Sequence, residues 1–334
     1  MKMLLPFVAV MALVAAALMA VNVANLHFLF GVAIPYIAFA VFTAGFVYRI
    51  VKWASSPVPF RIPTTCGQEF SLPWVKQNKI ENPSTATGVI IRMALEIFLF
   101  RSLFRNIKAE LRDGQKIVYG SDKWLWLAGL AFHWTFLVIL VRHLRFFVGD
   151  VPMSIAMLEH LDGFLQIGVP MIYITDGVIL AAIGYLFIRR VLLPQIRYIS
   201  LPADYFPLFL IAAIVVSGIL MRYIVKVDVV GVKNFTMGLV TFTPVIPATL
   251  MQGNGAWFFL HVFLISVLFA YFPFSKLMHM GGVFMSPTRN MINNSRMVRH
   301  VNPWNYPVHV HTYEEYENDF RDKMKAAGIP VEKE

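Results

Sequence analysis

The sequence predicts an all-α membrane protein with six transmembrane helices. Of its 334 residues, 58% are hydrophobic and 14% are charged, whereas soluble domains have roughly half and roughly a quarter. A helix needs about 20 mainly apolar residues to cross a bilayer. Six windows satisfy this requirement: residues 4–23, 28–51, 124–148, 164–188, 206–225 and 257–277.

These windows divide the chain into three parts. Lys2 followed by an Ala-rich run also resembles a secretory signal. The first window is therefore either a cleaved signal peptide or a retained transmembrane helix. We expect it to be retained as an extra N-terminal helix over residues 1–27. A core domain over 28–280, with a loop over 52–123, follows it. Residues 281–334 form a polar tail suited to docking a soluble partner.

The distribution of basic residues predicts the orientation. The loop over 52–123 is rich in Lys and Arg, whereas residues 149–162 contain three acids and no Lys or Arg. Basic loops face the cytoplasm, so we expect an inner (plasma) membrane protein with this loop and both termini in the cytoplasm. This topology explains the net charge of +10, and no nucleic-acid partner is expected. Charges at helical spacing over 88–111 predict a helix lying in the membrane interface, in contact with lipid.

Four histidines in or beside the apolar windows are the main functional signal. His133 and His143 are ten residues apart in one window, and His261 and His279 are eighteen apart at another. A histidine in hydrocarbon is costly unless it has a function. Hydrogen bonding between helices and a proton path are the alternatives. Two pairs on two helices favour two haems, each with one imidazole on either side, in a bundle of four or five helices.

The opposite directions of the two helices predict which histidines pair. His133 and His279 then form an inner pair and ligate one haem iron, while His143 and His261 form an outer pair and ligate the other. Ten residues of helix rise about 15 Å and eighteen rise about 27 Å. Because these lengths differ, we expect the last helix to bend or tilt near Pro273.

Arginines beside the outer pair are candidates for binding haem propionates. Arg142 and Arg145 flank His143, and Arg222 lies near the outer end of its helix. Guanidinium groups bind carboxylates well, although ordinary anchoring of the helix explains Arg222 equally. Cys66 is the only cysteine, which excludes a disulfide within the chain and a Cys-x-x-Cys-His haem attachment. It is either reactive or, more simply, buried near a partner interface.

The two histidine spacings resemble those of the nitrate reductase gamma subunit family, over about residues 28–280. Two further stretches, SSPVPFRIPTTCGQEF and SPTRNMINNSRMVRHVNPWN, resemble the branch with the cytochrome b of heterodisulfide reductase and, more closely, DsrM-type cytochromes of dissimilatory sulfite reduction. The resemblance implies a subunit that oxidises menaquinol and passes electrons through two b haems to a cytoplasmic iron–sulfur subunit resembling DsrK. It also implies further membrane and periplasmic subunits in a complex of anaerobic sulfite respiration.

The same resemblance implies a quinol site beside the outer haem. Asp176 is the candidate for handling the quinol protons, because an acid about 12 Å into a membrane helix is costly unless it has a function. His160 is a second candidate, since the topology places it nearby together with Tyr173 and Asp162. The family has a lysine at this site, but the outer loop after His143 contains none.

Two other classes of function stay open. The chain is either a cytochrome b anchor of another respiratory complex, such as a hydrogenase, a formate dehydrogenase or a heterodisulfide reductase, or a proton-coupled transporter without haem. The histidine spacing disfavours the hydrogenase and formate dehydrogenase types. A reduced-minus-oxidised visible spectrum separates the transporter from the cytochromes, because only a haem protein has a b-type α band.

Overall fold

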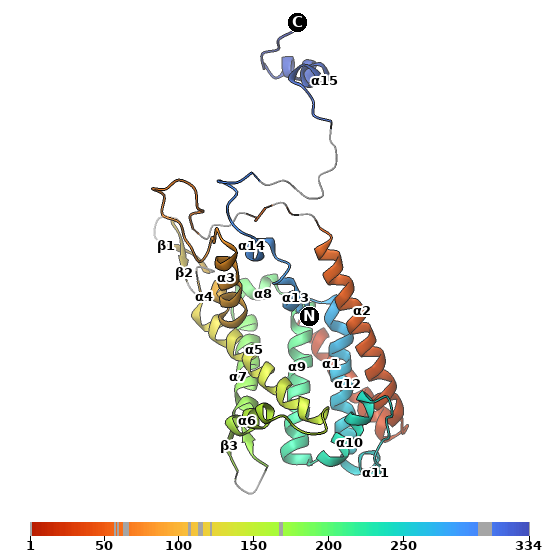
Figure 1. Cartoon of the computed structure of the whole chain (residues 1–334). Helices are drawn as coiled ribbons and strands as arrows, with labels where there is room; N and C mark the ends of the chain where they lie inside the picture. Colours follow the sequence, from red (N-terminus) through yellow and green to blue (C-terminus); the bar gives the residue numbers. More distant parts are fainter. Residues whose placement is uncertain are drawn as a thin grey trace.

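The structure is a helical bundle with a small helix, α15 (Tyr313–Ala326), beyond it (Figure 1). The computed structural model describes residues 2–56, 58, 60–62, 67–105, 108–112, 116–120, 122–166, 170–299 and 309–333. Cys66 lies outside the described residues, so its predicted burial stays a prediction.

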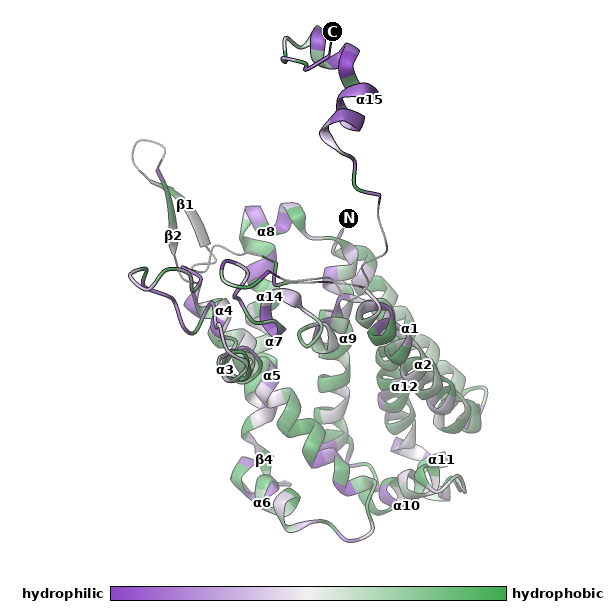
Figure 2. Cartoon of the chain, turned by 45° about the horizontal axis from the view of Figure 1, so that its top comes forward, coloured by the Kyte–Doolittle hydropathy of each residue, from purple (hydrophilic) through white to green (hydrophobic). Residues whose placement is uncertain are grey.

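Five helical segments in the described residues are long and apolar enough to cross a membrane. They are α1 (Leu4–Asn22), η1 with α2 (Leu29–Ala33, Ile34–Ala54), α5 with η2 (Lys123–His143, Leu144–Phe146), α9 with η3 (Pro202–Ile219, Leu220–Val225), and η4, α12 and η5 (Gly253–Gly255, Ala256–Tyr271, Phe272–Phe274). The bundle helices are mainly hydrophobic in Figure 2, whereas α15 is mainly hydrophilic. The chain is therefore a multi-pass membrane protein.

Helix α7 (Ile174–Leu192) differs from the sixth window that the sequence predicted. It packs along α5 but begins at residue 174, ten residues later than expected. The preceding segment forms a short hairpin of β3 (Gly163–Leu165) and β4 (Ile172–Tyr173). Pro170 lies between these strands and has no backbone N–H for a helix. Three charged residues near the helix ends make α7 less apolar than the other five segments: Asp176, Arg189 and Arg190.

The short elements gather at the two ends of the bundle (Figure 1). One end, the α3 end, carries α3 (Ala86–Leu99), α4 (Arg101–Phe104), β1 (Lys108–Arg112), β2 (Lys116–Gly120), α8 (Pro194–Ile199), α13 (His279–Gly282) and α14 (Pro287–Asn290). The other, the α6 end, carries α6 (Met153–Asp162), the β3–β4 hairpin, α10 (Val229–Val240) and α11 (Ala248–Met251). Helix α7 connects the α6 end to the α3 end.

Helix α12 lies at the centre of the bundle, where it packs against α1, α2 and α9. In its apolar window 44% of residues are buried, against 17–28% in the other four segments. Phe259 and Leu264 are fully buried there. Gly31 of η1 lets α2 approach α12 closely, because a Cβ at this position would lie 2.6 Å from the Phe259 ring.

The last membrane helix is interrupted at Pro273, where the sequence predicted a bend. Helix α12 ends at Tyr271, and η5 and η6 (Lys276–Met278) follow before α13 begins at His279. Gly45 of α2 packs directly on this interruption, because a Cβ there would lie 2.6 Å from the Cβ of Pro273. The extended backbone of Ser275 ends this helical run after η5, so His279 stands on a separate short helix.

A polar network joins distant loops at the α3 end. Arg92 of α3 is buried and donates to the Thr288 carbonyl at 2.7 Å, while Asn293 donates to Asn82 at 2.9 Å. The Glu81 carboxylate pairs with two arginines of the α4 region, Arg101 and Arg105. These contacts tie the loop after α2 to the segment after α13. The described residues of the two stretches that carry the branch resemblance lie in these two segments.

The long interfacial helix predicted over 88–111 is wrong in extent. Helix α3 ends at Leu99, where Phe100 adopts a left-handed backbone with φ of 49°, and Lys108 belongs to strand β1. Arg92 and Glu96 are also buried. Their helical spacing reflects partners inside the protein, since Glu96 accepts hydrogen bonds from Ser102.

Candidate functional site

The structure brings the four histidines together in two pairs. The rings of His133 and His279 have centroids 5.9 Å apart at the α3 end, with planes nearly perpendicular. The rings of His143 and His261 have centroids 6.5 Å apart towards the α6 end, with planes 21° from parallel. His133 and His143 lie on the same uninterrupted helix, α5, so the two levels are about 15 Å apart along its axis.

In each ring the Nδ1 atom already has a hydrogen-bond partner. Nδ1 of His133 lies 2.7 Å from the Gly129 carbonyl, and Nδ1 of His143 lies 2.7 Å from the Ile139 carbonyl. Nδ1 of His279 lies 2.9 Å from the Lys276 carbonyl. A carbonyl oxygen only accepts, so each of these Nδ1 atoms carries the proton and donates it. Nε2 of each ring is then unprotonated and available to a metal ion.

His261 also has its proton on Nδ1, but the hydrogen-bond partner is a side chain. It is buried, and its Nδ1 lies 2.8 Å from the hydroxyl oxygen of Ser217 on α9. The Ser217 hydroxyl donates its only proton to the Ile214 carbonyl at 2.9 Å. Its oxygen therefore accepts from His261 Nδ1, which again leaves Nε2 unprotonated. Gly218 gives this ring space, because a Cβ there would lie 3.3 Å from it.

The geometry of both pairs fits one iron ion between two imidazoles. An imidazole nitrogen lies roughly 2 Å from a first-row metal ion and about 1.1 Å from its ring centre, so opposed ligands have centres about 6.2 Å apart. The observed separations of 5.9 and 6.5 Å are close to this value. A hydrogen bond from the second ring nitrogen to a carbonyl is also the usual support of a metal-bound histidine. The residues present fit two haem irons.

Arg142 pairs with an acid of the protein. Its guanidinium lies 2.6 Å from Asp162 on α6, and both side chains are buried. Asp162 in turn accepts two hydrogen bonds from Thr175 at the start of α7. This buried ion pair therefore joins α5, α6 and α7. The Nε atom of Arg142 is buried without a hydrogen-bond partner in the described residues, so it is available to a further acceptor such as a propionate.

Arg145 and Arg222 also have partners within the protein. Arg145 forms an ion pair with Glu159 of α6, which also accepts a hydrogen bond from Tyr173 at 2.5 Å. Arg222 donates to the Met171 carbonyl at 3.0 Å, and its guanidinium lies 4.1 Å from the Tyr173 ring centroid. The binding of propionates by these arginines stays a prediction.

Asp176 lies in the first turn of α7, and the predicted depth of about 12 Å is wrong because the helix starts at Ile174. Its carboxylate accepts a hydrogen bond from Tyr223 at 2.7 Å. The Tyr223 oxygen accepts from the Tyr173 backbone N–H. His160 is exposed on α6, and the described contacts do not link it to Asp176. The preceding residue, Glu159, makes the contacts at this place, with Arg145 and Tyr173, where the sequence analysis expected His160.

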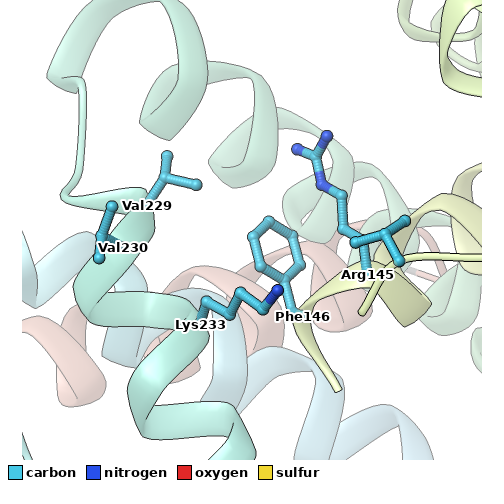
Figure 3. Close-up of a pocket in the computed structure, with 6 residues that line it drawn as sticks. Arg145, Phe146, Val229, Val230 and Lys233 are labelled. Carbon is cyan, nitrogen blue, oxygen red and sulfur yellow. The ribbon is translucent and has the colours of Figure 1, made fainter. Parts of the chain in front are cut away.

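A cavity of about 260 Å³ opens at the α6 end beside the His143 level (Figure 3). Its walls are almost entirely apolar, and the side chains of Arg145 in η2 and Lys233 in α10 contribute to them. The lining residues are Arg145, Phe146, Val151, Val229, Val230 and Lys233. The Phe146 ring lies 5.9 Å from the His143 ring, centroid to centroid, so the cavity wall contacts the outer histidine pair.

Lys233 is the residue that the sequence left unassigned at this site. It belongs to α10, almost a hundred residues after His143, yet its ammonium donates to the Gly149 carbonyl at 2.8 Å. Thr236, one turn later, donates to the Phe146 carbonyl at 2.6 Å. These bonds hold α10 against the loop after His143. A lysine is thus present beside this loop, although it comes from another segment. In the sequence, the short apolar stretch of α10 was the signal that could have indicated a helix packed at this end.

The comparisons place the chain in a family. Residues 93–301 match the nitrate reductase gamma subunit family, a region that contains all four histidines. The chain is 46% identical over 280 residues to the Hdr-like menaquinol oxidoreductase cytochrome b-like subunit of Archaeoglobus fulgidus, covering 83% of each chain. The same-named subunit of Archaeoglobus profundus is 47% identical over 277 residues, covering 81% of each. The chain belongs to the nitrate reductase gamma subunit family.

A more distant relative supports the same assignment. The nitrate reductase gamma chain of Bacillus subtilis is 27% identical over 222 residues, which is 60% of this chain and 91% of the relative. The larger coverage of the relative indicates that this chain has additional segments outside the shared domain.

Proposed function

We propose that the chain is the dihaem cytochrome b subunit of a membrane menaquinol oxidoreductase. It oxidises menaquinol at the α6 end and delivers electrons to a partner subunit at the α3 end. The observation that carries the proposal is the pair of histidine levels, each with ring separations and Nδ1 hydrogen bonds suited to one iron. The names of the Archaeoglobus relatives support menaquinol as the donor.

The four histidines would hold two b haems. Haem iron supplies a carrier that accepts and releases one electron at a time. His133 and His279 would hold the haem near the α3 end, and His143 and His261 the other. The Nδ1 hydrogen bonds fix the orientation of each ring and leave its Nε2 unprotonated. The histidines would therefore need little rearrangement when they bind iron.

The cavity beside Phe146 is the proposed menaquinol site. A volume of about 260 Å³ is near the lower end of ligand pockets, so it suits a flat bicyclic ring with its tail in lipid. The apolar valines would pack on the ring. Lys233 and Arg145 would donate hydrogen bonds to the ring oxygens.

Oxidation of one quinol releases two electrons and two protons, and the protons need acceptors near the ring. Glu159 is a candidate acceptor, because its ion-pair partner Arg145 lines the cavity. Asp176 and Tyr223 form a second hydrogen-bonded pair at this end. We propose that these groups pass protons to the α6 face, with His160 exposed on α6 as a further acceptor.

The α3 end is the proposed docking surface for a cytoplasmic iron–sulfur subunit. Its loop is held rigidly by buried polar contacts but exposes large apolar side chains, with Trp74 80% and Leu72 52% accessible. Exposed apolar groups on a rigid polar loop are typical of interaction surfaces. The partner would resemble DsrK, with further membrane and periplasmic subunits, in a Dsr-type complex of sulfite respiration. In this arrangement α7 is a sixth span, and both termini are cytoplasmic.

The first test is a reduced-minus-oxidised spectrum of the purified protein with a haem-to-protein ratio. We expect a b-type α band and two haems per chain. His143→Ala and His261→Ala should each lose the same haem, and His133→Ala and His279→Ala should each lose the other. Two haems retained in all four variants, or no α band in the unaltered protein, would contradict the proposal, and the second result would favour a proton-coupled transporter.

A second test addresses the menaquinol site. Lys233→Ala should leave both haems bound and slow their reduction by a menaquinol analogue in stopped-flow measurements, and Asp176→Asn should do the same. Lys226→Ala is the matched control, since Lys226 follows η3 at the same end but does not line the cavity. Equal reduction rates for Lys233→Ala and Lys226→Ala would exclude the cavity as the site.

A further inference from the structure

The segment that leads into α15 places two imidazoles and two carboxylates together. His309 and His311 are two residues apart, directly before Thr312 and the first turn of α15. Their ring centroids are 5.1 Å apart. His309 Nε2 lies 3.9 Å from a Glu315 oxygen, and His311 Nδ1 lies 3.9 Å from an Asp319 oxygen.

The cap of α15 positions Glu315 within this cluster. Thr312 is the N-cap, and its hydroxyl accepts the Glu315 backbone N–H. The Glu315 carboxylate returns the contact, since Oε2 accepts the Thr312 N–H at 2.8 Å. This reciprocal capping box fixes the carboxylate at the helix start. Its second oxygen, Oε1, is the atom that faces His309. Asp319 lies one helical turn later, on the same face as Glu315.

We propose that His309, His311 and Glu315 form a binding site for a divalent transition-metal ion of the zinc type, with Asp319 or water as the fourth ligand. One ligand atom from each of the three residues lies within 4.8 Å of the others. Ligands of one tetrahedral zinc ion are about 3.3 Å apart, given bonds of about 2 Å. The cluster therefore needs to contract by about 0.6 Å at its 3.9 Å contact and by at most about 1.5 Å between its other ligand atoms. These side chains are exposed and can move by that much.

Imidazole with carboxylate is a ligand set that zinc and its neighbours accept and that magnesium and calcium do not prefer. Binding would also stabilise the helix. A helix of 14 residues is marginal alone, and an ion shared by His309 and Glu315 would tie its first turn to the preceding segment. The site is independent of the haem ligands and of the menaquinol cavity.

The test uses the full, haem-loaded chain in detergent, so that the four histidines of the bundle are occupied. Zinc is titrated against a chromophoric chelator, and amide hydrogen exchange of residues 313–326 is followed. We expect one zinc ion per chain and slower exchange in α15. His309→Ala and His311→Ala should weaken zinc binding at least about ten-fold, since even outer-shell changes cause such losses.

Two further variants separate metal binding from helix stability. Glu315→Gln keeps the capping box, because Gln serves in it as well as Glu, but removes the charged ligand. It should therefore weaken zinc binding without changing exchange in the absence of zinc. Asp322→Asn is the control, an exposed acid of α15 outside the cluster, and should bind zinc normally. Equal zinc binding by the unaltered chain and the His309→Ala/His311→Ala variant would overturn the proposal.

Discussion

Ser217→Ala is the sharpest test of how the protein prepares His261. The Ser217 oxygen accepts the Nδ1 proton of the buried His261 at 2.8 Å, and the Ile214 carbonyl, which accepts from the Ser217 hydroxyl, also lies beside this imidazole. Before a haem binds, the imidazole of the variant can move its proton to Nε2. Once Nε2 binds iron, the proton must stay on Nδ1, which has lost the Ser217 oxygen and has only the Ile214 carbonyl nearby. The cost of the substitution therefore falls on the haem-bound state.

The magnitude is bounded above by the cost of an unsatisfied buried donor, about 1–3 kcal/mol, because the Ile214 carbonyl can replace part of the lost hydrogen bond. At 1.4 kcal/mol per factor of ten, haem affinity at the His143–His261 level should fall by at most about 5- to 150-fold. The other haem should be unaffected, since its histidines are about 15 Å away along α5. The assay is the haem-to-protein ratio after dilution and washing, combined with a redox titration that resolves the two b haems.

Ser266→Ala is the matched control. Ser266 is also a buried helix serine, and its hydroxyl donates to the Val262 carbonyl at 2.8 Å, four residues back. A general effect of removing a buried hydroxyl would appear in both variants. If Ser217→Ala and Ser266→Ala lose haem equally, or if neither loses any, the hydrogen bond to His261 does not prepare the site and the reasoning is refuted.

Two other predictions concern the packing at Pro273 and the acid at the α6 end. Gly45→Ala should destabilise the protein by about 1–3 kcal/mol through overpacking against Pro273, and it should weaken binding of only the haem at the α3 end. Gly184→Ala is the control, because the space around Gly184 is open, and it should change neither property. Equal thermal stability and equal haem content in the two variants would contradict this prediction. Burial opposes ionisation of Glu159, yet hydrogen bonds and charges, Arg145 first, hold the pKa of its carboxyl below its usual range. The stability that this adds is present above the ordinary carboxyl pKa and is lost as pH falls through the lower folded-state value. The difference in melting temperature between the unaltered protein and Glu159→Gln should therefore be constant near neutral pH and vanish in acid, and a difference that persists in acid would refute it.

The sequence predicted the histidine pairing because helix direction and residue spacing are local properties. His133 and His279 must share one level, and His143 and His261 the other, for any antiparallel pair of these helices. The interruption at Pro273 was predicted for a similar reason, since proline removes a helix hydrogen bond and clashes with the preceding turn. Ligation by these residues remains the prediction that the haem measurements test.

The features that sequence reasoning missed depend on contacts between distant segments. Lys233 reaches the loop after His143 only because α10 folds back on it. The ion pair of Arg142 with Asp162 joins two helices, and neither residue alone indicates the other. The start of α7 was misplaced because an apolar run was read as helix, although its residues form a short hairpin. Periodicity cannot separate these states in short apolar segments.

The interruption at Pro273 also explains how unequal spacings give two matched levels. On α5 the two histidines are ten residues apart in one continuous helix, a rise of about 15 Å. On α12 the helix continues for ten residues after His261, as far as Tyr271, and so rises by the same amount. The remaining eight residues to His279 follow η5, η6 and α13, and the extended backbone of Ser275 breaks the helix between η5 and η6. Gly45 admits Pro273 at this point, and the interruption returns His279 to the level of His133. Equal rise, rather than equal residue count, is what two haems between antiparallel helices require.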